Sequence, residues 1–162
     1  MRLLYRSKQQ GARVMTRSEI REHIFRLVFR LEFNDPSEMP AQISRYFTDV
    51  YKDDETGEGE AFKICLFSDD EEAYIKNKYD SIASRRSELD EIINKNSKGW
   101  DVSRIGKVDL AILRLAVYEV LFDDDIPVGV AIDEAVELAK KYGQDESSSF
   151  VNGILASVAK SL

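Results

Sequence analysis

The sequence predicts an all-α protein of about seven helices. Apolar residues recur at helical spacing through most of the chain, and no segment shows the alternation of apolar and polar residues that indicates a β-strand. Two segments, Thr16-Arg17-Ser18-Glu19 and Ser68-Asp69-Asp70-Glu71, also fit the capping-box pattern, in which Ser or Thr is followed three residues later by Glu. The capping motifs and the spacing of the apolar residues therefore both predict an all-α fold.

The N-terminal helix is expected to begin after Thr16 and to run to about Phe33. Its core stripe consists of Ile20, Ile24, Leu27, Val28 and Leu31. Met15 stands directly before the cap and is a candidate for the natural first residue. Residues 1–14 then form a basic extension, either disordered or upstream of the natural start, and residues 15–162 form a single helical domain.

The middle of the chain is expected to hold two helical segments separated by a loop. A helix follows Pro36, and a longer run from Ser68 toward Asn96 is expected to break near Ser84–Ser87. The loop includes residues 51–60 (YKDDETGEGE), which are polar and contain glycine. Its acidic residues lack the glycine that a calcium loop needs at its sixth position, so the sequence indicates no metal site there.

Three helices are expected in the last third of the chain. Leu110 to Phe122 is apolar except for Arg114 and Glu119, so other helices are expected to surround it. Glu119 either belongs to a buried polar network, for example with Arg114, or contacts a partner.

The next helix begins near Pro127, which is tolerated in a first turn, and Gly143 is expected to end it in the left-handed conformation. The last helix carries an apolar stripe made of Phe150, Val151, Ile154, Leu155, Val158 and Leu162. Within it, Asn152 and Gly153 are expected to serve close helix packing.

Charge is distributed very unevenly along the chain. Residues 1–30 contain eight basic and two acidic residues, a net charge of +6, whereas the whole chain carries −7 and the rest therefore −13. A basic N-terminal region on an acidic body favours local contact with phosphates over nonspecific wrapping of nucleic acid. Without residues 1–14, the N-terminal excess falls to +2.

The first helix contains candidate RNA-binding residues. Arg17 and Arg21 lie four residues apart at the edge of the core stripe, and Phe29 falls nearly opposite the core. Single-stranded RNA is bound by aromatic rings that stack on bases and by arginines that hold phosphates. In the alternative interpretation, Phe25, Phe29 and Phe33 pack against a second layer of helices.

The sequence does not favour an enzyme or a cofactor-binding protein. It contains none of the nucleotide-binding or zinc-protease motifs, and its carboxylates cluster where solvation is expected. His23 is expected to have a structural role, and Cys65 to fill apolar space, with no disulfide or metal site. No segment fits an export signal or a membrane span.

Three segments of the last third stand in a fixed order: VDLAILRLAVYE, IPVGVAIDEAVELAKKYG and SSFVNGIL. In sequence and spacing they resemble the NusB family of bacterial transcription antitermination factors. The resemblance implies a noncatalytic, cytoplasmic RNA-binding adaptor whose helices form two small packed bundles that share a core.

The resemblance also implies partners. A NusB-family protein pairs with the small-subunit ribosomal protein NusE, and the pair binds boxA RNA near RNA polymerase and other Nus factors. The family's arginine cluster and aromatic residue fall here on Arg17, Arg21 and Phe29. Its acidic partner contact falls on Asp109, and Glu119 is a second candidate for that contact.

Two questions stay open at this point. A helical protein–protein adaptor that never touches RNA is the competing hypothesis, and the sequence does not decide between a monomer and a homodimer. Ser149 stands where relatives can carry a basic residue, which removes one phosphate contact.

Overall fold

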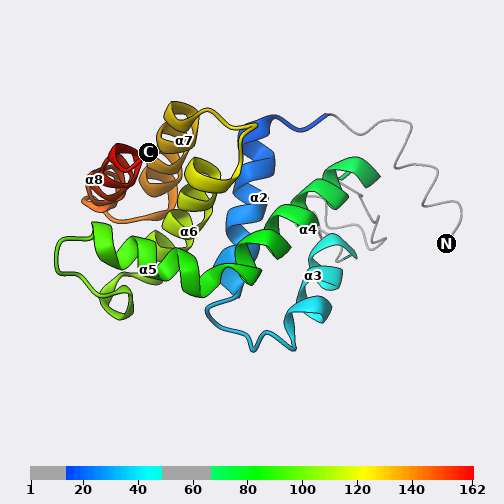
Figure 1. The fold of residues 1–162 in the computed structure, drawn as a ribbon. Helices are drawn as coiled ribbons and strands as arrows, with labels where there is room; N and C mark the ends of the chain where they lie inside the picture. Colours follow the sequence, from blue (N-terminus) through cyan, green and yellow to red (C-terminus); the bar gives the residue numbers. More distant parts are fainter. Residues whose placement is uncertain (1–13, 49–66) are drawn as a thin grey trace, which may run out of the picture.

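The computed structural model describes residues 14–48 and 67–162 (Figure 1). Within these ranges the chain forms seven α-helices, one short 3-10 helix and no strand. The elements are α2 (Arg17–Arg30), α3 (Met39–Thr48), α4 (Asp69–Ser84), α5 (Arg86–Asn96), η1 (Val102–Arg104), α6 (Lys107–Phe122), α7 (Val128–Tyr142) and α8 (Ser147–Lys160). The predicted all-α class is confirmed.

The helices form two bundles that meet at α6. In the N-terminal bundle α2 packs on α4, and α3 is anchored by the buried side chains of Met39, Tyr46 and Phe47. In the C-terminal bundle α6 packs against α5, α7 and α8. Because α2 also packs on α6, the two bundles share one apolar core. Figure 1 shows α6 between α2 on one side and α8 on the other.

Helix α6 is the centre of the molecule, as its composition predicts. Every side chain from Leu110 to Val117 is buried, and so are Glu119 and Val120. Burial of a large aliphatic side chain contributes about 1.5–3 kcal/mol, so this helix is a main source of stability. The polar exceptions within it, Arg114 and Glu119, must find partners inside the protein, since an unpaired buried charge is strongly unfavourable.

Most predicted helix ends are confirmed. Both capping boxes form, with Thr16 capping α2 and Ser68 capping α4. The expected break in the following run lies at Arg85, between α4 and α5. Helix α2 is shorter than expected because it ends at Arg30, and the next three residues continue as a turn.

Two predictions about glycines are wrong. Gly143 ends α7 with φ −89°, which is not the left-handed conformation. Glycine is needed there for space, because a Cβ atom would lie 2.5 Å from Cβ of Ser147 and 2.7 Å from the carbonyl oxygen of Ala139. Gly153 was expected to serve close packing, but it is exposed and a Cβ atom there would meet nothing within 4 Å.

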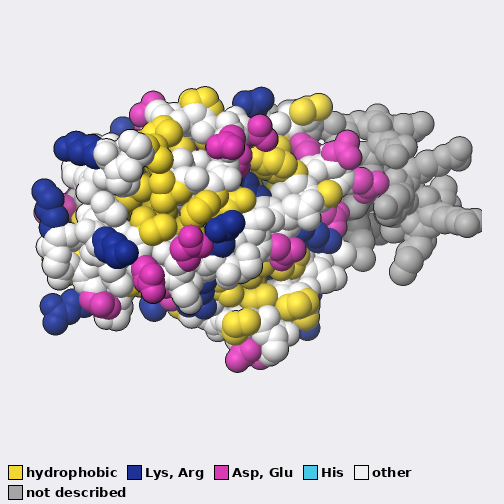
Figure 2. Space-filling view, in the orientation of Figure 1, with side chains coloured by type: hydrophobic (Ala, Val, Ile, Leu, Met, Phe, Trp, Pro, Cys, Tyr) yellow, Lys and Arg dark blue, Asp and Glu magenta, His cyan; other side chains and the backbone are white. Residues whose placement is uncertain are grey.

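Some predictions concern residues outside the described ranges. These are the basic extension, the 51–60 loop and Cys65, so the division of the chain at residue 15 stays a prediction. Among the described residues, no helix is both long and apolar enough to cross a membrane. In the view of Figure 2, acidic, basic and apolar side chains are interspersed over the surface.

Candidate nucleic-acid interface

The N-terminus of α2 presents Arg17 to solvent. The hydroxyl of Thr16 accepts a hydrogen bond from the backbone N–H of Glu19 (3.1 Å), and the Glu19 carboxylate accepts one from the N–H of Thr16 (2.8 Å). These reciprocal bonds fix where the helix begins. Arg17 is its first residue, and its exposed side chain makes no ion pair with another described residue.

Arg21, one turn further along α2, points into the protein. It is 5% exposed, and its Nε and Nη2 atoms donate to the two carboxylate oxygens of Glu119 on α6, at 2.9 and 3.0 Å. Burial by itself lowers the pKa of Arg21, but the bonds to Glu119 and the charge of Glu134 outweigh it and raise that pKa. Arg21 is therefore a charged residue that joins α2 to α6.

Lys78 on α4 completes this buried network. Its Nζ lies 3.0 Å from Oε2 of Glu119 and 3.0 Å from Oδ2 of Asp123. Burial lowers the pKa of Lys78, but attraction by Glu119 outweighs it and raises that pKa. Glu119 is itself 1% exposed, so its charge is neutralised by two cations from two different helices. The network fastens α2, α4 and α6 together.

A groove of about 460 Å³ lies over this network. It is lined by Arg17, Ile20, Arg21, Ile24, Tyr74, Lys78, Asp125 and Ile126. Nη1 of Arg21 has no hydrogen-bond partner there, although Oε2 of Glu134 lies 3.6 Å away. The nearby carboxylates neutralise Arg21 and Lys78, so Arg17 is the lining cation most available to an anionic ligand.

A row of aromatic rings runs along α2, from the side that faces α7 to the C-terminal end of α2. The ring of Phe25 lies 5.1 Å from that of Tyr142 on α7 and 6.2 Å from that of Phe29, and Phe29 lies 5.0 Å from Phe33, between centroids. Phe25 is buried, Phe29 is partly buried against the core, and Phe33 is 62% exposed. The packing interpretation therefore holds for Phe25 and in part for Phe29, while Phe33 lies at the surface, and RNA binding by Phe29 stays a prediction.

A second polar cluster fixes α2 against the end of α7. Glu22 accepts hydrogen bonds from Arg26 (2.9 Å), from Lys141 (2.9 Å) and from the hydroxyl of Tyr142. Burial raises the pKa of Glu22, but the bonds from Tyr142 and Lys141 outweigh it and lower that pKa. Arg26 and Lys141 keep part of their side chains exposed, so this cluster carries cations at the surface beside the aromatic row.

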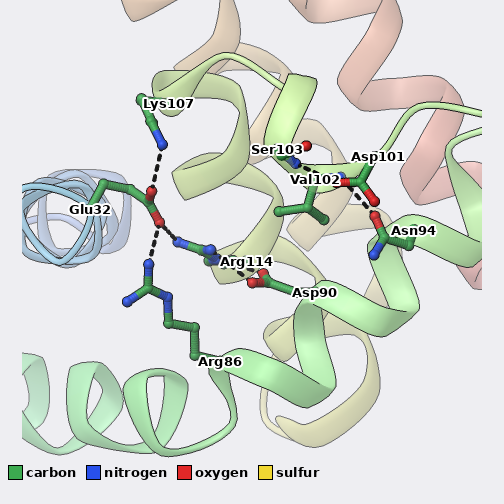
Figure 3. A network of polar contacts seen from close by, with 9 residues as sticks. All are labelled: Glu32, Arg86, Asp90, Asn94, Asp101, Val102, Ser103, Lys107 and Arg114. Atoms are coloured by element: carbon green, nitrogen blue, oxygen red, sulfur yellow. Dashed lines mark hydrogen bonds and ion pairs between the residues drawn. The ribbon is translucent and has the colours of Figure 1, made fainter.

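A third cluster connects the end of α2 to α5 and α6 (Figure 3). Glu32 accepts from Arg86 (2.9 Å), from Lys107 (3.0 Å) and from Arg114, whose Nε and Nη2 also donate to Asp90 at 2.7 and 2.9 Å. Burial raises the pKa of Glu32, but the bonds from Arg114 and Lys107 outweigh it and lower that pKa to about 2.

The other residues expected to matter lie apart from these clusters. Asp109 is partly exposed in the first turn of α6, where a negative charge interacts favourably with the helix dipole. His23 on α2 contacts α3, since its Nδ1 is hydrogen-bonded to the hydroxyl of Tyr46, and its ring centroid lies 4.7 Å from that of Phe67. Burial and the charge of Arg26 lower the pKa of His23, in agreement with a structural role.

Comparison with protein families shows which family the chain belongs to. A family model described as the NusB family matches residues 18–160, which is most of the chain. The chain belongs to the NusB family. This is the family that the sequence resembles, and its members are noncatalytic transcription antitermination factors, so the expectation that the protein is not an enzyme is confirmed.

Individual relatives support the assignment to the NusB family. The transcription antitermination protein NusB of Agathobacter rectalis is 49% identical over 145 residues, which cover 90% of this chain and 100% of the relative. That of Lachnoclostridium phytofermentans is 46% identical over 144 residues, covering 89% and 98%. The alignments thus span nearly the whole of each protein.

Solved structures agree with the NusB assignment. The structure of T. maritima NusB superposes with a TM-score of 0.72 at 30% identity, covering 91% of this chain and 93% of that one. A structure described as antitermination factors NusB and NusE in complex with dsRNA superposes with a TM-score of 0.68 at 25% identity, covering 91% and 100%.

In this NusB-family chain, the predicted site residues fall into two groups, one in the interior and one at or near the surface. Arg21, expected to contact RNA, and Glu119, expected either in a buried network or at a partner surface, are paired with each other in the interior. Glu119 does not pair with Arg114, which bonds to Glu32 and Asp90 instead. Arg17, Phe29 and Asp109 lie at or near the surface.

Three residues that hold the polar clusters of the NusB-family chain together were not singled out by the sequence interpretation. Lys78, Tyr142 and Glu32 each complete a polar cluster. For Lys78 and Glu32 the signal was indirect, since two charged residues within the apolar helix α6 require buried counterions. Nothing in the sequence indicated the bond of Tyr142 to Glu22.

Proposed function

We propose that this NusB-family protein is an adaptor that binds boxA-type RNA together with the ribosomal protein NusE. The bound RNA would then stay near RNA polymerase and the other Nus factors, and the protein would act in the cytoplasm, where bacterial transcription takes place. The proposal rests mainly on the exposed position of Arg17. This residue is exposed at the start of α2, has no counterion among the described residues, and belongs to a chain similar to a NusB solved with NusE and dsRNA.

The RNA-binding face would run along α2 from Arg17 to Phe29 and on to Phe33 in the turn after the helix. Arg21 and Phe25 along this line are buried, so contact with RNA would fall to Arg17, Phe29 and Phe33. An exposed guanidinium at one end and accessible rings at the other fit a phosphate and bases. A direct contact between Arg21 and RNA would require the buried network to open, because Nε and Nη2 are bonded to Glu119 and Nη1 is itself buried.

The NusE-binding face would include Asp109. Asp109 lies two residues after Lys107, whose ammonium group bonds to Glu32. A partner seated there would meet an acidic group and a basic group. A direct partner contact by Glu119 would require the buried network to open, so its contribution would come through Arg21.

Fluorescence anisotropy with labelled boxA RNA and a scrambled RNA, with and without NusE and at two salt concentrations, tests the proposal. We expect tighter and sequence-selective binding when NusE is present. Arg17→Ala should weaken binding to both RNAs roughly threefold to tenfold and reduce the slope of log affinity against log salt by about one. The matched control is Arg45→Ala, which removes an exposed arginine from α3 and should leave both quantities unchanged.

The competing adaptor without RNA contact makes the opposite prediction. In that case Arg17→Ala would behave like Arg45→Ala, while Asp109→Lys would still abolish NusE capture. Unselective RNA binding under every condition, with NusE binding intact, would overturn the proposed RNA role. Arg21→Ala is unsuitable for this test, because it leaves Glu119 without its bidentate partner and would disturb the fold.

A further inference from the structure

The single tryptophan of the chain lies at the surface, far along the sequence from α2. Trp100 is 53% exposed in the connection between α5 and η1. Its ring stands edge-on to that of Phe150 on α8, at 6.4 Å between centroids and an interplanar angle of 77°. Gly153, one turn beyond Phe150, would place a Cβ atom in open space, so this side of α8 is uncovered.

The turn that carries Trp100 is held in place on both sides. Lys98 and Gly99 both have positive φ, 47° and 90°, and the N–H of Trp100 donates to the carbonyl oxygen of Ser97 at 3.2 Å. The hydroxyl of the buried Ser97 donates to the carbonyl oxygen of Trp100. The ring thus projects from an ordered turn, so the turn would lose little conformational entropy when a ligand stacks on the ring.

The residues after Trp100 are fastened as well (Figure 3). The N–H of Val102 donates to the side-chain oxygen of Asn94 at the end of α5 (2.7 Å), and the N–H of Ser103 donates to Asp101 (2.8 Å). Together with the bonds to Ser97, these contacts fix the backbone before and after the tryptophan.

The surroundings of Trp100 are basic, although the body of the protein is acidic. Residues 95–107 contain four basic residues and one acidic residue, whereas residues 31–162 as a whole carry −13. Lys95 and Lys98 are exposed and make no ion pair with another described residue. In Figure 2, mainly basic side chains appear at the end of the molecule where α5 and α8 lie. An anionic ligand is therefore favoured at this end.

A nucleic-acid base fits this surface better than an apolar protein segment does. Protein-binding hot spots lie within a patch that excludes water, but the chain neighbours of Trp100 are exposed glycine, lysine and aspartate. Stacking of a base needs only one accessible ring face, with cations nearby for the adjoining phosphates.

We infer that Trp100 stacks on a base of single-stranded RNA, with Phe150 supporting its ring and Lys95 and Lys98 near the backbone phosphates. This second contact is separate from Arg17 and Phe29, and it deepens the proposed RNA-binding function on which it rests. The RNA path then extends from α2 across to the end of the molecule formed by α5 and α8.

The test uses the intrinsic fluorescence of the full chain, because its only tryptophan is Trp100. A single-stranded RNA containing boxA and flanking nucleotides is titrated into the protein, and anisotropy of the same labelled RNA is followed in parallel. We expect saturable quenching of Trp100 with the binding constant that anisotropy gives. Trp100→Ala should weaken binding roughly 5- to 150-fold without changing the salt slope, and Trp100→Phe should restore most of the affinity.

The outcomes separate this inference from the proposed function. Normal binding by anisotropy with unchanged tryptophan fluorescence, and wild-type affinity in Trp100→Ala, would overturn the stacking site and leave the function of α2 intact. Fluorescence that responds to NusE but not to RNA would identify a protein contact instead. If neither signal reports RNA binding with or without NusE, both proposals fail. Circular dichroism of each variant verifies that the exposed substitution leaves the fold unchanged.

Discussion

Arg21 on α2 and Glu119 on α6 form a bidentate ion pair across 98 positions of sequence, with N–O distances of 2.9 and 3.0 Å. Both side chains are almost fully buried, and Lys78 adds a second cation to the same carboxylate. Burial removes the hydrating water from both charges, so the pair is stable only because its close, bidentate contact offsets that desolvation cost. It orients the N-terminal turn of α2, from which Arg17 projects, against the central helix.

Removing the charge of Glu119 should destabilise the protein strongly. Glu119→Gln leaves the guanidinium of Arg21 and the ammonium of Lys78 buried with one counter-charge fewer, so we expect a loss of about 3 kcal/mol in the free energy of unfolding. Urea denaturation followed by circular dichroism measures it. Glu137→Gln, which breaks the exposed pair with Lys140, should change stability by less than about 0.5 kcal/mol. Equal small losses in both variants would show that the buried network contributes little.

Glu32 should make stability depend on pH in the acidic range. Its pKa is about 2 in the folded protein, below the ordinary value of 4.5, so its contribution is present above pH 4.5 and is lost as pH falls toward 2. At neutral pH, Glu32→Gln should therefore be less stable than the wild type by roughly 2 kcal/mol. Urea unfolding across this range should show that the difference disappears on acidification.

The control for this pH effect is Glu88→Gln. Glu88 pairs with Arg85 at the surface, with about half of its side chain exposed, so its substitution should change stability by less than about 0.5 kcal/mol at every pH. A difference between wild type and Glu32→Gln that stays constant from neutral pH to the acid limit would contradict the assignment.

Two glycine substitutions should have opposite effects. Gly143→Ala places a methyl group 2.5 Å from Ser147 and should destabilise the protein by about 1–3 kcal/mol, because the junction between α7 and α8 must shift. Gly153→Ala lies within α8 with open space around it and should stabilise by up to about 1 kcal/mol, since alanine favours the helix. Thermal unfolding compares the two, and a loss of stability in Gly153→Ala would mean that this face of α8 is covered.

The aromatic row should separate into core and surface residues. Phe25→Ala removes a buried ring and should lower stability by about 3–5 kcal/mol, whereas Phe33→Ala should change it by less than about 0.5 kcal/mol, because Phe33 is mostly exposed. Chemical denaturation provides both values. If Phe33→Ala proved as destabilising as Phe25→Ala, the row would be a packing layer along its whole length and Phe33 would be unavailable for binding.

The surface site could be predicted from sequence only in part. Arg17 follows a recognisable helix cap, so its place at the exposed start of α2 could be read from local pattern. Arg21 lies only one turn further on the same edge of the stripe, yet it is turned inward by a carboxylate on another helix. Trp100 has no comparable local signal, because its exposure depends on how α5, η1 and α8 meet.

The sequence by itself determined the helices, the burial of α6 and the family, because caps and apolar periodicity are local properties of the chain. Tertiary structure decided which charges meet: Arg21 with Glu119, Arg114 with Asp90 and Glu32, and Glu22 with Lys141. The physical reason is that an ion pair depends on the distance between atoms in space. Helical spacing shows which face a charge occupies but not which charge of another helix lies opposite it.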